Sequence, residues 1–170
     1  PEEIDLAIVS ARAEAVPGIF ENCVDAGVKG AIVISGGFAE VGNVDLQKRI
    51  IQIAKEADFP FIGPNCLGVY SPPYYDSFFF APERLSNPKQ GNVAMISQSG
   101  GLLVDQMISF SIEGVGLSLA VSIGNKAYVR ETDLLDYLAT NDMTKVICLY
   151  IEGFKEDEGR EFLLKAREMV

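Results

Sequence analysis

Short apolar runs alternate with longer amphipathic segments along most of the chain. The runs have almost no polar interruption, which is typical of strands buried on both faces of a parallel sheet. In the segments between them, apolar residues recur at helical spacing; Val16, Phe20 and Val24 are an example. The pattern predicts strands at residues 5–10, 30–35, 59–62, 93–96, 117–123 and 146–151, and helices at 13–26, 44–57, 100–113, 131–139 and 158–170. Such alternation predicts an α/β fold with parallel sheets covered by helices on both faces.

One stretch, residues 70–91, breaks this alternation. It is rich in Pro, Tyr, Phe, Ser and Asn and contains the pairs Pro72-Pro73 and Asn87-Pro88. We expect an ordered linker here, and its apolar run at residues 78–80 is expected to pack on a domain surface. The chain is therefore predicted to form two partial parallel-sheet units, residues 1–70 and 92–170, joined by a linker at residues 71–91.

Composition narrows the possible partners and the compartment. The net charge of −10 argues against nucleic acid or an anionic membrane as the main partner, since both require clustered Lys and Arg. There is no histidine, and the three cysteines lack CxxC spacing, so no metal site is expected and a reducing cytoplasm is predicted. No apolar run reaches the roughly 18 residues of a membrane-spanning helix. Because the chain starts at Pro1, we expect it to be a segment of a longer protein.

Polar or glycine-rich turns follow the predicted strands, at the sheet edge where α/β proteins bind ligands. The turn after residues 93–96 carries hydroxyls and glycines and opens a helix, an arrangement whose free backbone N–H groups suit a phosphate-sized anion. Small polar residues are also common wherever a strand turns into a helix, so each turn alone has a purely structural interpretation. The turns are Ser10-Ala11-Arg12, Ser35-Gly36-Gly37-Phe38, Gly63-Pro64-Asn65-Cys66, Ser97-Gln98-Ser99-Gly100-Gly101, Gly124-Asn125-Lys126 and Glu152-Gly153.

Two of these turns together resemble the α-subunit region of the NDP-forming acyl-CoA synthetases, the superfamily of succinyl-CoA synthetase and ADP-forming acetyl-CoA synthetase. They are Gly63-Pro64-Asn65-Cys66 and Ser97-Gln98-Ser99-Gly100. The matching segments span nearly the whole chain and imply the end of a Rossmann-like CoA-binding domain followed by the first half of a flavodoxin-like ligase domain. The implied reaction forms acyl-CoA reversibly from an acid, CoA and a nucleoside triphosphate, with release of NDP and phosphate.

The resemblance also implies roles for individual residues. Glu152 would be catalytic, with its carboxylate on the imidazole of a phosphorylated histidine. The residues Ser97, Gln98, Ser99 and Gly100 would hold the phosphate, although either serine could instead be only a helix N-cap. Coenzyme A would be bound by Ser10, Ala11, Arg12, Ser35, Gly36, Gly37, Asn65 and Cys66. We expect the thiol of Cys66 to be a small buried side chain and not a nucleophile, because nothing near it in sequence would lower its pKa. The loop Gly124-Asn125-Lys126-Ala127 also matches, but Tyr128 stands where the family often has an acidic residue, which leaves the role of the loop open.

Several parts of such an enzyme are expected outside these residues. The family's glycine-rich loop would lie upstream and its histidine downstream, so the segment alone is expected to be inactive. The expected partners of the complete enzyme are CoA, a small carboxylic acid, and ATP/ADP or GTP/GDP with Mg on an ATP-grasp β-subunit or fused domain, within an oligomer. One alternative is a CoA- or small-molecule-sensing regulatory domain of a protein lysine acetyltransferase, which resembles the same family without its histidine. Another is a flavin- or nucleotide-binding α/β module, which would leave residues 63–72 unexplained.

Overall fold

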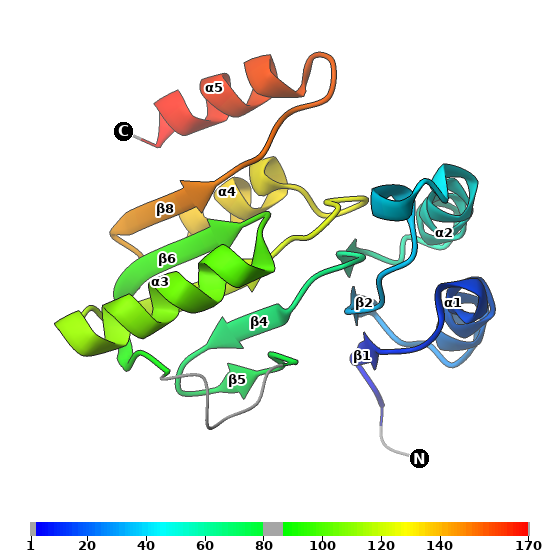
Figure 1. Ribbon diagram of the computed structural model, residues 1–170, viewed down its shortest axis with the longest axis horizontal. Helices are drawn as coiled ribbons and strands as arrows, with labels where there is room; N and C mark the ends of the chain where they lie inside the picture. The colour runs from blue at the N-terminus through cyan, green and yellow to red at the C-terminus, as the bar shows by residue number, and fades with distance from the viewer. Residues whose placement is uncertain (1–2, 80–86, 170) are drawn as a thin grey trace.

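The computed structural model describes residues 3–79 and 87–169, which form two α/β units side by side (Figure 1). The first unit contains β1 (Leu6–Val9), η1 (Ala13–Ala15), α1 (Val16–Asp25), β2 (Gly30–Val33), η2 (Ala39–Val41), α2 (Val44–Glu56) and β3 (Phe61–Ile62). The second contains β4 (Gly68–Ser71), β5 (Tyr75–Asp76), β6 (Gln90–Ser97), α3 (Gly100–Glu113), β7 (Leu117–Ser122), α4 (Glu131–Ala139), β8 (Val146–Tyr150) and α5 (Glu158–Glu168).

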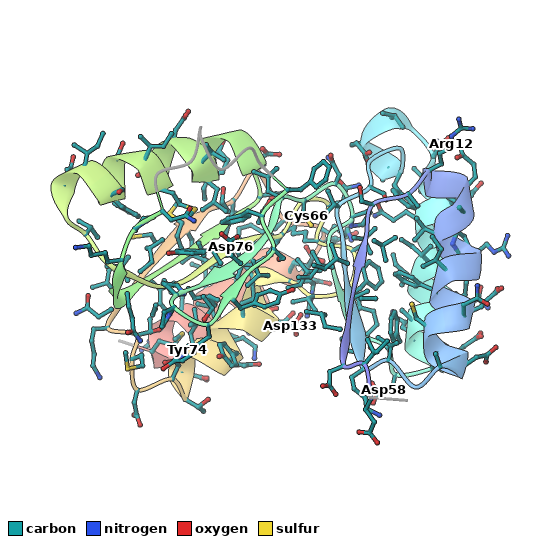
Figure 2. All side chains as sticks on the ribbon, turned by 90° about the horizontal axis from the view of Figure 1, so that it is seen from below. Arg12, Asp58, Cys66, Tyr74, Asp76 and Asp133 are labelled. Atoms are coloured by element: carbon teal, nitrogen blue, oxygen red, sulfur yellow. The ribbon has the colours of Figure 1, made fainter. Side chains whose placement is uncertain are left out.

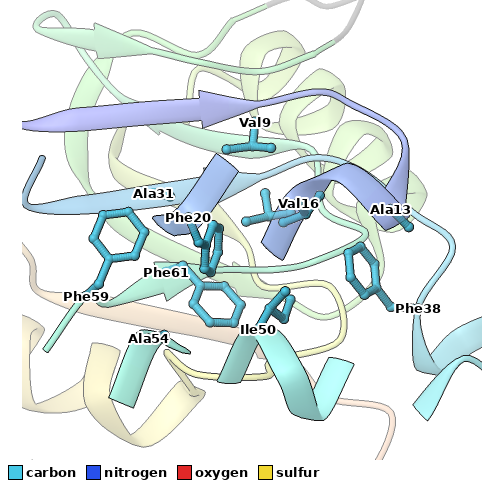
Figure 3. Close-up of a cluster of buried hydrophobic side chains, with 11 residues drawn as sticks. Val9, Ala13, Val16, Phe20, Ala31, Phe38, Ile50, Ala54, Phe59 and Phe61 are labelled. Atoms are coloured by element: carbon cyan, nitrogen blue, oxygen red, sulfur yellow. The ribbon is translucent and has the colours of Figure 1, made fainter. Parts of the chain in front are cut away.

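The first unit is a three-stranded parallel sheet in the order β1-β2-β3, with α1 and α2 on one face. Its core is dominated by aromatic rings (Figure 3): Phe20 of α1 packs edge-on against Phe59 and Phe61, with both pairs of ring centroids 5.1 Å apart. On the opposite face, Leu6 and Ile8 remain 41% and 52% exposed. In the described residues this sheet is therefore covered by helices on one face only, whereas its sequence pattern predicted helices on both.

The second unit is a five-stranded sheet in the order β5-β4-β7-β6-β8, in which β7, β6 and β8 run parallel. Met95, Leu117 and Ala120 pack with Leu103 and Met107 of α3. The alternate positions of the same strands, together with α4, form a second core made of Ala94, Ile96, Leu119, Val121, Ile123, Leu134 and Leu138. Alternation of side chains over residues 94–96 of β6 and 119–121 of β7 thus buries the two faces of the sheet against different helices.

The predicted α/β class with parallel sheet units is confirmed, and the predicted helices at 100–113 and 131–139 coincide with α3 and α4. One difference concerns residues 68–76. Here β4 pairs antiparallel with both β5 and β7, so these residues are hydrogen-bonded into the second sheet. Phe78 packs against the core of the second unit and stacks on Tyr70, while Phe79 is 64% exposed and Phe80 lies outside the described residues. The division at residues 70 and 91 stays a prediction.

The loop after β7 holds the two units together through hydrogen bonds to the first unit. The backbone N–H groups of Asn125, Ala127 and Val129 donate to the carbonyls of Pro64, Gly63 and Phe61, at 2.9, 3.0 and 3.1 Å. Gly124 lies so close to the other chain segment that a Cβ placed on it would be 2.3 Å from the Pro64 carbonyl oxygen. The turn after β3 and the turn after β7 are therefore in direct contact. Within the described residues, no helix is long and apolar enough to cross a membrane.

Candidate functional site

A cleft of about 700 Å³ lies where the carboxyl ends of the two sheets meet. The turns that follow β1, β2 and β3 form one side of the cleft. The turns that follow β6, β7 and β8 form the other side. Of the predicted site residues, Ser10, Ser35, Asn65, Cys66, Gln98, Ser99, Gly100 and Glu152 line this cleft. Ala11, Arg12, Gly36, Gly37 and Ser97 are not among the lining residues. Ile34, Glu40, Leu67, Phe79, Gly101, Gly124 and Asn125 complete the lining.

On the first unit, a hydrogen bond ties the turns after β1 and β2 together. Ser35 is buried, and its Oγ accepts from the backbone N–H of Ala11 at 2.9 Å. Arg12 immediately precedes η1, and its carbonyl accepts from Ala15 N–H. Its side chain is exposed at the outer end of the first unit, while Cys66 lies between the two units (Figure 2). Arg12 therefore gives the cleft no positive charge in this structure.

Cys66 is a buried thiol at the base of the cleft. It is 4% exposed, and its Sγ donates to the carbonyl of Val33 at 3.3 Å. Burial raises its pKa to about 12, and hydrogen bonds from backbone N–H groups only partly offset that effect. The thiol is therefore protonated at neutral pH, as expected for a packing residue and not for a nucleophile.

A polar cluster from both units occupies one wall of the cleft. The side-chain Nδ2 of Asn125 donates to Glu40 Oε2 at 2.6 Å and to Gln47 Oε1 at 2.9 Å, and Asn65 Nδ2 donates to Asn125 Oδ1 at 3.4 Å. Backbone N–H groups of Gly37 and Phe38 also donate to Glu40. Burial alone would raise the pKa of Glu40, but these hydrogen bonds outweigh it and lower the pKa below 4.5. The cluster holds an ionised carboxylate and fixes the Asn65 amide beside the cleft.

On the second unit, the turn after β6 opens α3. Ser99 is the N-cap: its Oγ accepts from Leu102 N–H at 3.3 Å and its hydroxyl proton stays free to donate to a ligand. Ser97 is completely buried and its Oγ donates to the Ser99 carbonyl at 2.7 Å, which braces the turn from inside. Gly101 has open space beside its Cα, and its N–H is one of the unpaired donors at the start of a 14-residue helix. The end of this helix can therefore hold an anion in the cleft.

Glu152 reaches the same cleft from the end of β8. It is exposed, and its backbone N–H donates to Gln98 Oε1 at 3.0 Å. The Gln98 N–H in turn donates to the carbonyl of Tyr150 at 2.9 Å. These two bonds connect the glutamate turn to the turn that opens α3, so a carboxylate and a set of anion-binding N–H groups lie together.

Sequence reasoning missed Glu40 and Gln47 and left the role of Asn125 open. Glu40 lies in the short η2 and Gln47 in the first half of α2, where a polar residue in the sequence indicates only a solvent-facing position, although Gln47 is in fact buried. No local pattern distinguishes them. Only Asn125 carried a signal, because it follows a buried strand in the same way as the other strand-end residues.

The two halves of the chain match two known domain families. The family model for a CoA binding domain matches residues 1–72, and the model for a succinyl-CoA ligase like flavodoxin domain matches residues 90–170. The ADP-forming acetate–CoA ligase of Methanocaldococcus jannaschii is 40% identical over 99% of this chain and 23% of its own length. The alpha subunit of the Pyrococcus furiosus ADP-forming acetate–CoA ligase I is 36% identical over 99% of this chain and 36% of its own length.

A solved structure gives the same result for the fold. Acetyl-coenzyme A synthetase 1 of Ca. Korarchaeum cryptofilum, in complex with phosphate and ADP, superposes with a TM-score of 0.91 and is 37% identical over 99% of this chain and 36% of that one. The chain thus spans between 23% and 36% of the length of these three proteins. Two family models match successive parts of the chain, and the three proteins named here match 99% of it. The chain therefore belongs to the superfamily of NDP-forming acyl-CoA synthetases and contains a CoA-binding domain followed by a flavodoxin-like ligase domain.

Proposed function

We propose that the chain is the CoA- and phosphate-binding part of an NDP-forming acid–CoA ligase and acts within a larger enzyme. The observation that carries this proposal is the single cleft in which the turns after β1, β2 and β3 face the N-terminus of α3 and Glu152. A ligase of this kind needs the thiol of CoA and the phosphorylated group to meet at one place. The relatives named above are themselves ligases, which favours this function over a sensing domain of an acetyltransferase.

The first unit would bind coenzyme A through the turns after its strands. Ser10, Ser35 and Asn65 line the cleft, whereas Gly36 and Gly37 would contact CoA outside it. The Asn65 amide has its nitrogen engaged with Asn125, so its Oδ1 is the group available to accept from a ligand N–H. Ala11 and Arg12 would likewise contact CoA outside the cleft.

The second unit would hold the phosphate of a phosphorylated histidine contributed by another part of the complete enzyme. Ser99, Gly100 and Gly101 offer a hydroxyl and helix N-terminal N–H groups, which favour an anion without any cationic side chain. Glu152 would accept a hydrogen bond from the imidazole, fix its tautomer and stabilise its positive charge. Nucleotide with Mg would bind elsewhere, on an ATP-grasp subunit or domain.

Asn65 tests the CoA half of the proposal. Its φ is +58°, where a side chain other than Asn or Asp is strained, so Asn65→Gly removes the amide without disturbing the backbone. In the complete ligase, calorimetry should show weaker CoA binding by about 1–3 kcal/mol. The control Asn22→Gly would be confounded by its helix, so Asn22→Ala on the exposed face of α1 is the matched variant and should bind CoA normally. Equal CoA affinity in Asn65→Gly and wild type would contradict the assignment.

Glu152 tests the phosphate half. Glu152→Gln keeps the size of the side chain but cannot offset the charge of an imidazolium, and losses near 10⁴-fold are known when a triad carboxylate becomes an amide. Incubation of the complete ligase with labelled ATP should show strongly reduced phosphoenzyme in Glu152→Gln. Glu156→Gln, an exposed residue of the same loop outside the cleft, should label normally. Wild-type labelling of Glu152→Gln would mean that Glu152 is only a loop residue.

A further inference from the structure

Lys126 is a buried lysine that points away from the cleft, on the loop after β7. Its side chain is 5% exposed, and its Nζ lies 3.1 Å from Glu131 Oε1 and 3.6 Å from Glu158 Oε2. The ammonium also stands 4.8 Å from the ring centroid of Phe154. Lysine is among the side chains least often buried, because removing its charge from water is costly unless the charge is fully paired. A buried lysine in this place therefore requires an explanation beyond packing.

A fourth partner of Lys126, the backbone of Gly153, gives that explanation. Its Nζ donates to the backbone carbonyl of Gly153 at 2.8 Å, and Gly153 directly follows Glu152. Glu152 itself donates its N–H to Gln98 at 3.0 Å. Residues 151–157 are neither strand nor helix, so these two side chains fix the backbone on both sides of the Glu152 Cα. Glu131, which is 1% exposed, and Glu158, which lies 3.6 Å from Nζ, both supply counter-charge to the ammonium, so one carboxylate remains beside it if the other is neutralised.

The same loop is fixed to the turn that carries Asn65. Asn125 and Ala127, the two neighbours of Lys126, donate their N–H groups to Pro64 and Gly63 of the first unit. The backbone of Lys126 is left-handed, with φ +43°, which turns its side chain toward α4 and α5 while its neighbours stay on the first unit. The loop thus contacts the Asn65 turn with its backbone and the Glu152 turn with the Lys126 side chain.

We propose that Lys126 is a positioning residue that holds the Glu152 carboxylate at the cleft through the carbonyl of Gly153. The inference rests on the role proposed above for Glu152 and extends it to a residue that does not line the cleft. The competing explanation is that Lys126 serves only to attach α5 to α4. Arg130 provides that attachment independently, because its guanidinium pairs with Glu161 at 3.2 Å and with Glu158 at 3.9 Å.

The test compares variants of the complete ligase that differ in one contact. Lys126→Met alone would leave the Glu131 carboxylate buried without a partner and could prevent folding. The double variant Lys126→Met with Glu131→Gln removes both charges together and keeps the side-chain volumes. Glu131→Gln alone retains the ammonium and its bond to Gly153, and is the matched control. Arg130→Met removes a cation from the same network without touching Gly153, and controls for a weakened α5.

Two readouts separate positioning from structure. Amide hydrogen exchange of Glu152 should be about tenfold faster in the double variant than in Glu131→Gln, as expected when one hydrogen bond of ordinary strength is lost. Phosphoenzyme formation should fall about 10- to 100-fold while CoA affinity stays within about twofold, because a displaced catalytic group affects the reaction and not the binding. Arg130→Met should leave Glu152 exchange unchanged.

The outcomes are distinct. If the double variant matches Glu131→Gln in Glu152 exchange and in phosphoenzyme formation, Lys126 does not position Glu152. If exchange rises equally throughout α4, α5 and residues 151–157, the role is only structural and the proposal is overturned. If wild-type enzyme forms no phosphoenzyme, the proposed ligase function fails, and the exchange of Glu152 still decides whether Lys126 fixes this turn.

Discussion

Gly124→Ala is the substitution that most directly tests the contact between the two units. Gly124 has φ +53°, in the left-handed region, and a Cβ placed there would be 2.3 Å from the Pro64 carbonyl oxygen and 2.4 Å from that of Asn65. Both are main-chain atoms that cannot rotate away. The methyl group therefore forces the loop after β7 to withdraw from the turn after β3.

The size of the effect follows from two contributions. The left-handed conformation itself costs about 1–2 kcal/mol for alanine. To reach ordinary contact at 3.4 Å, the loop must move by about 1 Å, which stretches the 2.9 Å bond from Asn125 N to Pro64 O beyond hydrogen-bonding distance. The neighbouring bond from Ala127 N to Gly63 O would be lost with it, and each bond contributes about 0.5–1.5 kcal/mol. The total destabilisation is about 2–5 kcal/mol.

Urea denaturation followed by circular dichroism measures this loss, since the chain has no tryptophan. Gly114→Ala is the matched control: Gly114 has φ +73° and no atom within 4 Å of the added Cβ, so it reports the backbone contribution alone. We expect Gly124→Ala to lose at least about 1 kcal/mol more than Gly114→Ala. Equal losses in the two variants would refute the close approach of the units, and with it the geometry of the cleft.

Three further predictions concern the cleft. Because burial raises the Cys66 pKa from 9.0 to about 12, iodoacetamide at pH 8 should alkylate Cys66 about a thousandfold more slowly in folded than in urea-unfolded protein; comparable rates would contradict its burial. The folded pKa of Glu40 is lowered, so its carboxylate stabilises the protein above pH 4.5 and loses that effect as the pH falls through the folded pKa. The stability difference between wild type and Glu40→Gln should accordingly be constant from pH 5 to 7 and shrink at lower pH, and a difference that grows in acid would show the sign to be wrong. Ser99→Ala should lower the free energy of unfolding by about 1 kcal/mol through loss of the α3 N-cap, whereas an unchanged value would remove Ser99 as the cap.

Local sequence signals predicted most of the secondary structure. Periodicity located α3 and α4 to the residue, because an amphipathic stripe bounded by Ser99 and Gly114, or by Arg130 and Thr140, is encoded within a few turns. Strands β4 and β5 were not predicted. Residues 68–76 contain glycine and prolines and show no alternation, and β4 is a strand because it pairs with β7, far away in sequence. Such pairing leaves no trace in the local pattern.

The candidate site divides in the same way. The rule that ligands lie beyond the carboxyl ends of parallel strands placed Ser10, Ser35, Asn65, Ser99 and Glu152 at one edge from the sequence alone, and all five line the cleft. The rule could not tell that Arg12 would lie outside, since this depends on η1 starting directly after it. Nor could it tell that the Ser97 hydroxyl would be used up by the Ser99 carbonyl.

Other features exist only because the two units meet. Glu40 and Gln47 belong to the first unit and Asn125 to the second, and their hydrogen bonds form only when Gly124 docks against Pro64 and Asn65. In the sequence, Lys126 likewise looks like an ordinary loop lysine. Only in the folded protein do α4 and α5 bury it against Glu131 and Gly153. The sequence by itself determined the helices, the parallel strands and the chemistry of each turn, because those depend on neighbours within a few residues. Which turns share a cleft, and which side chains hold them there, was decided by contacts between distant segments that only the tertiary structure brings together.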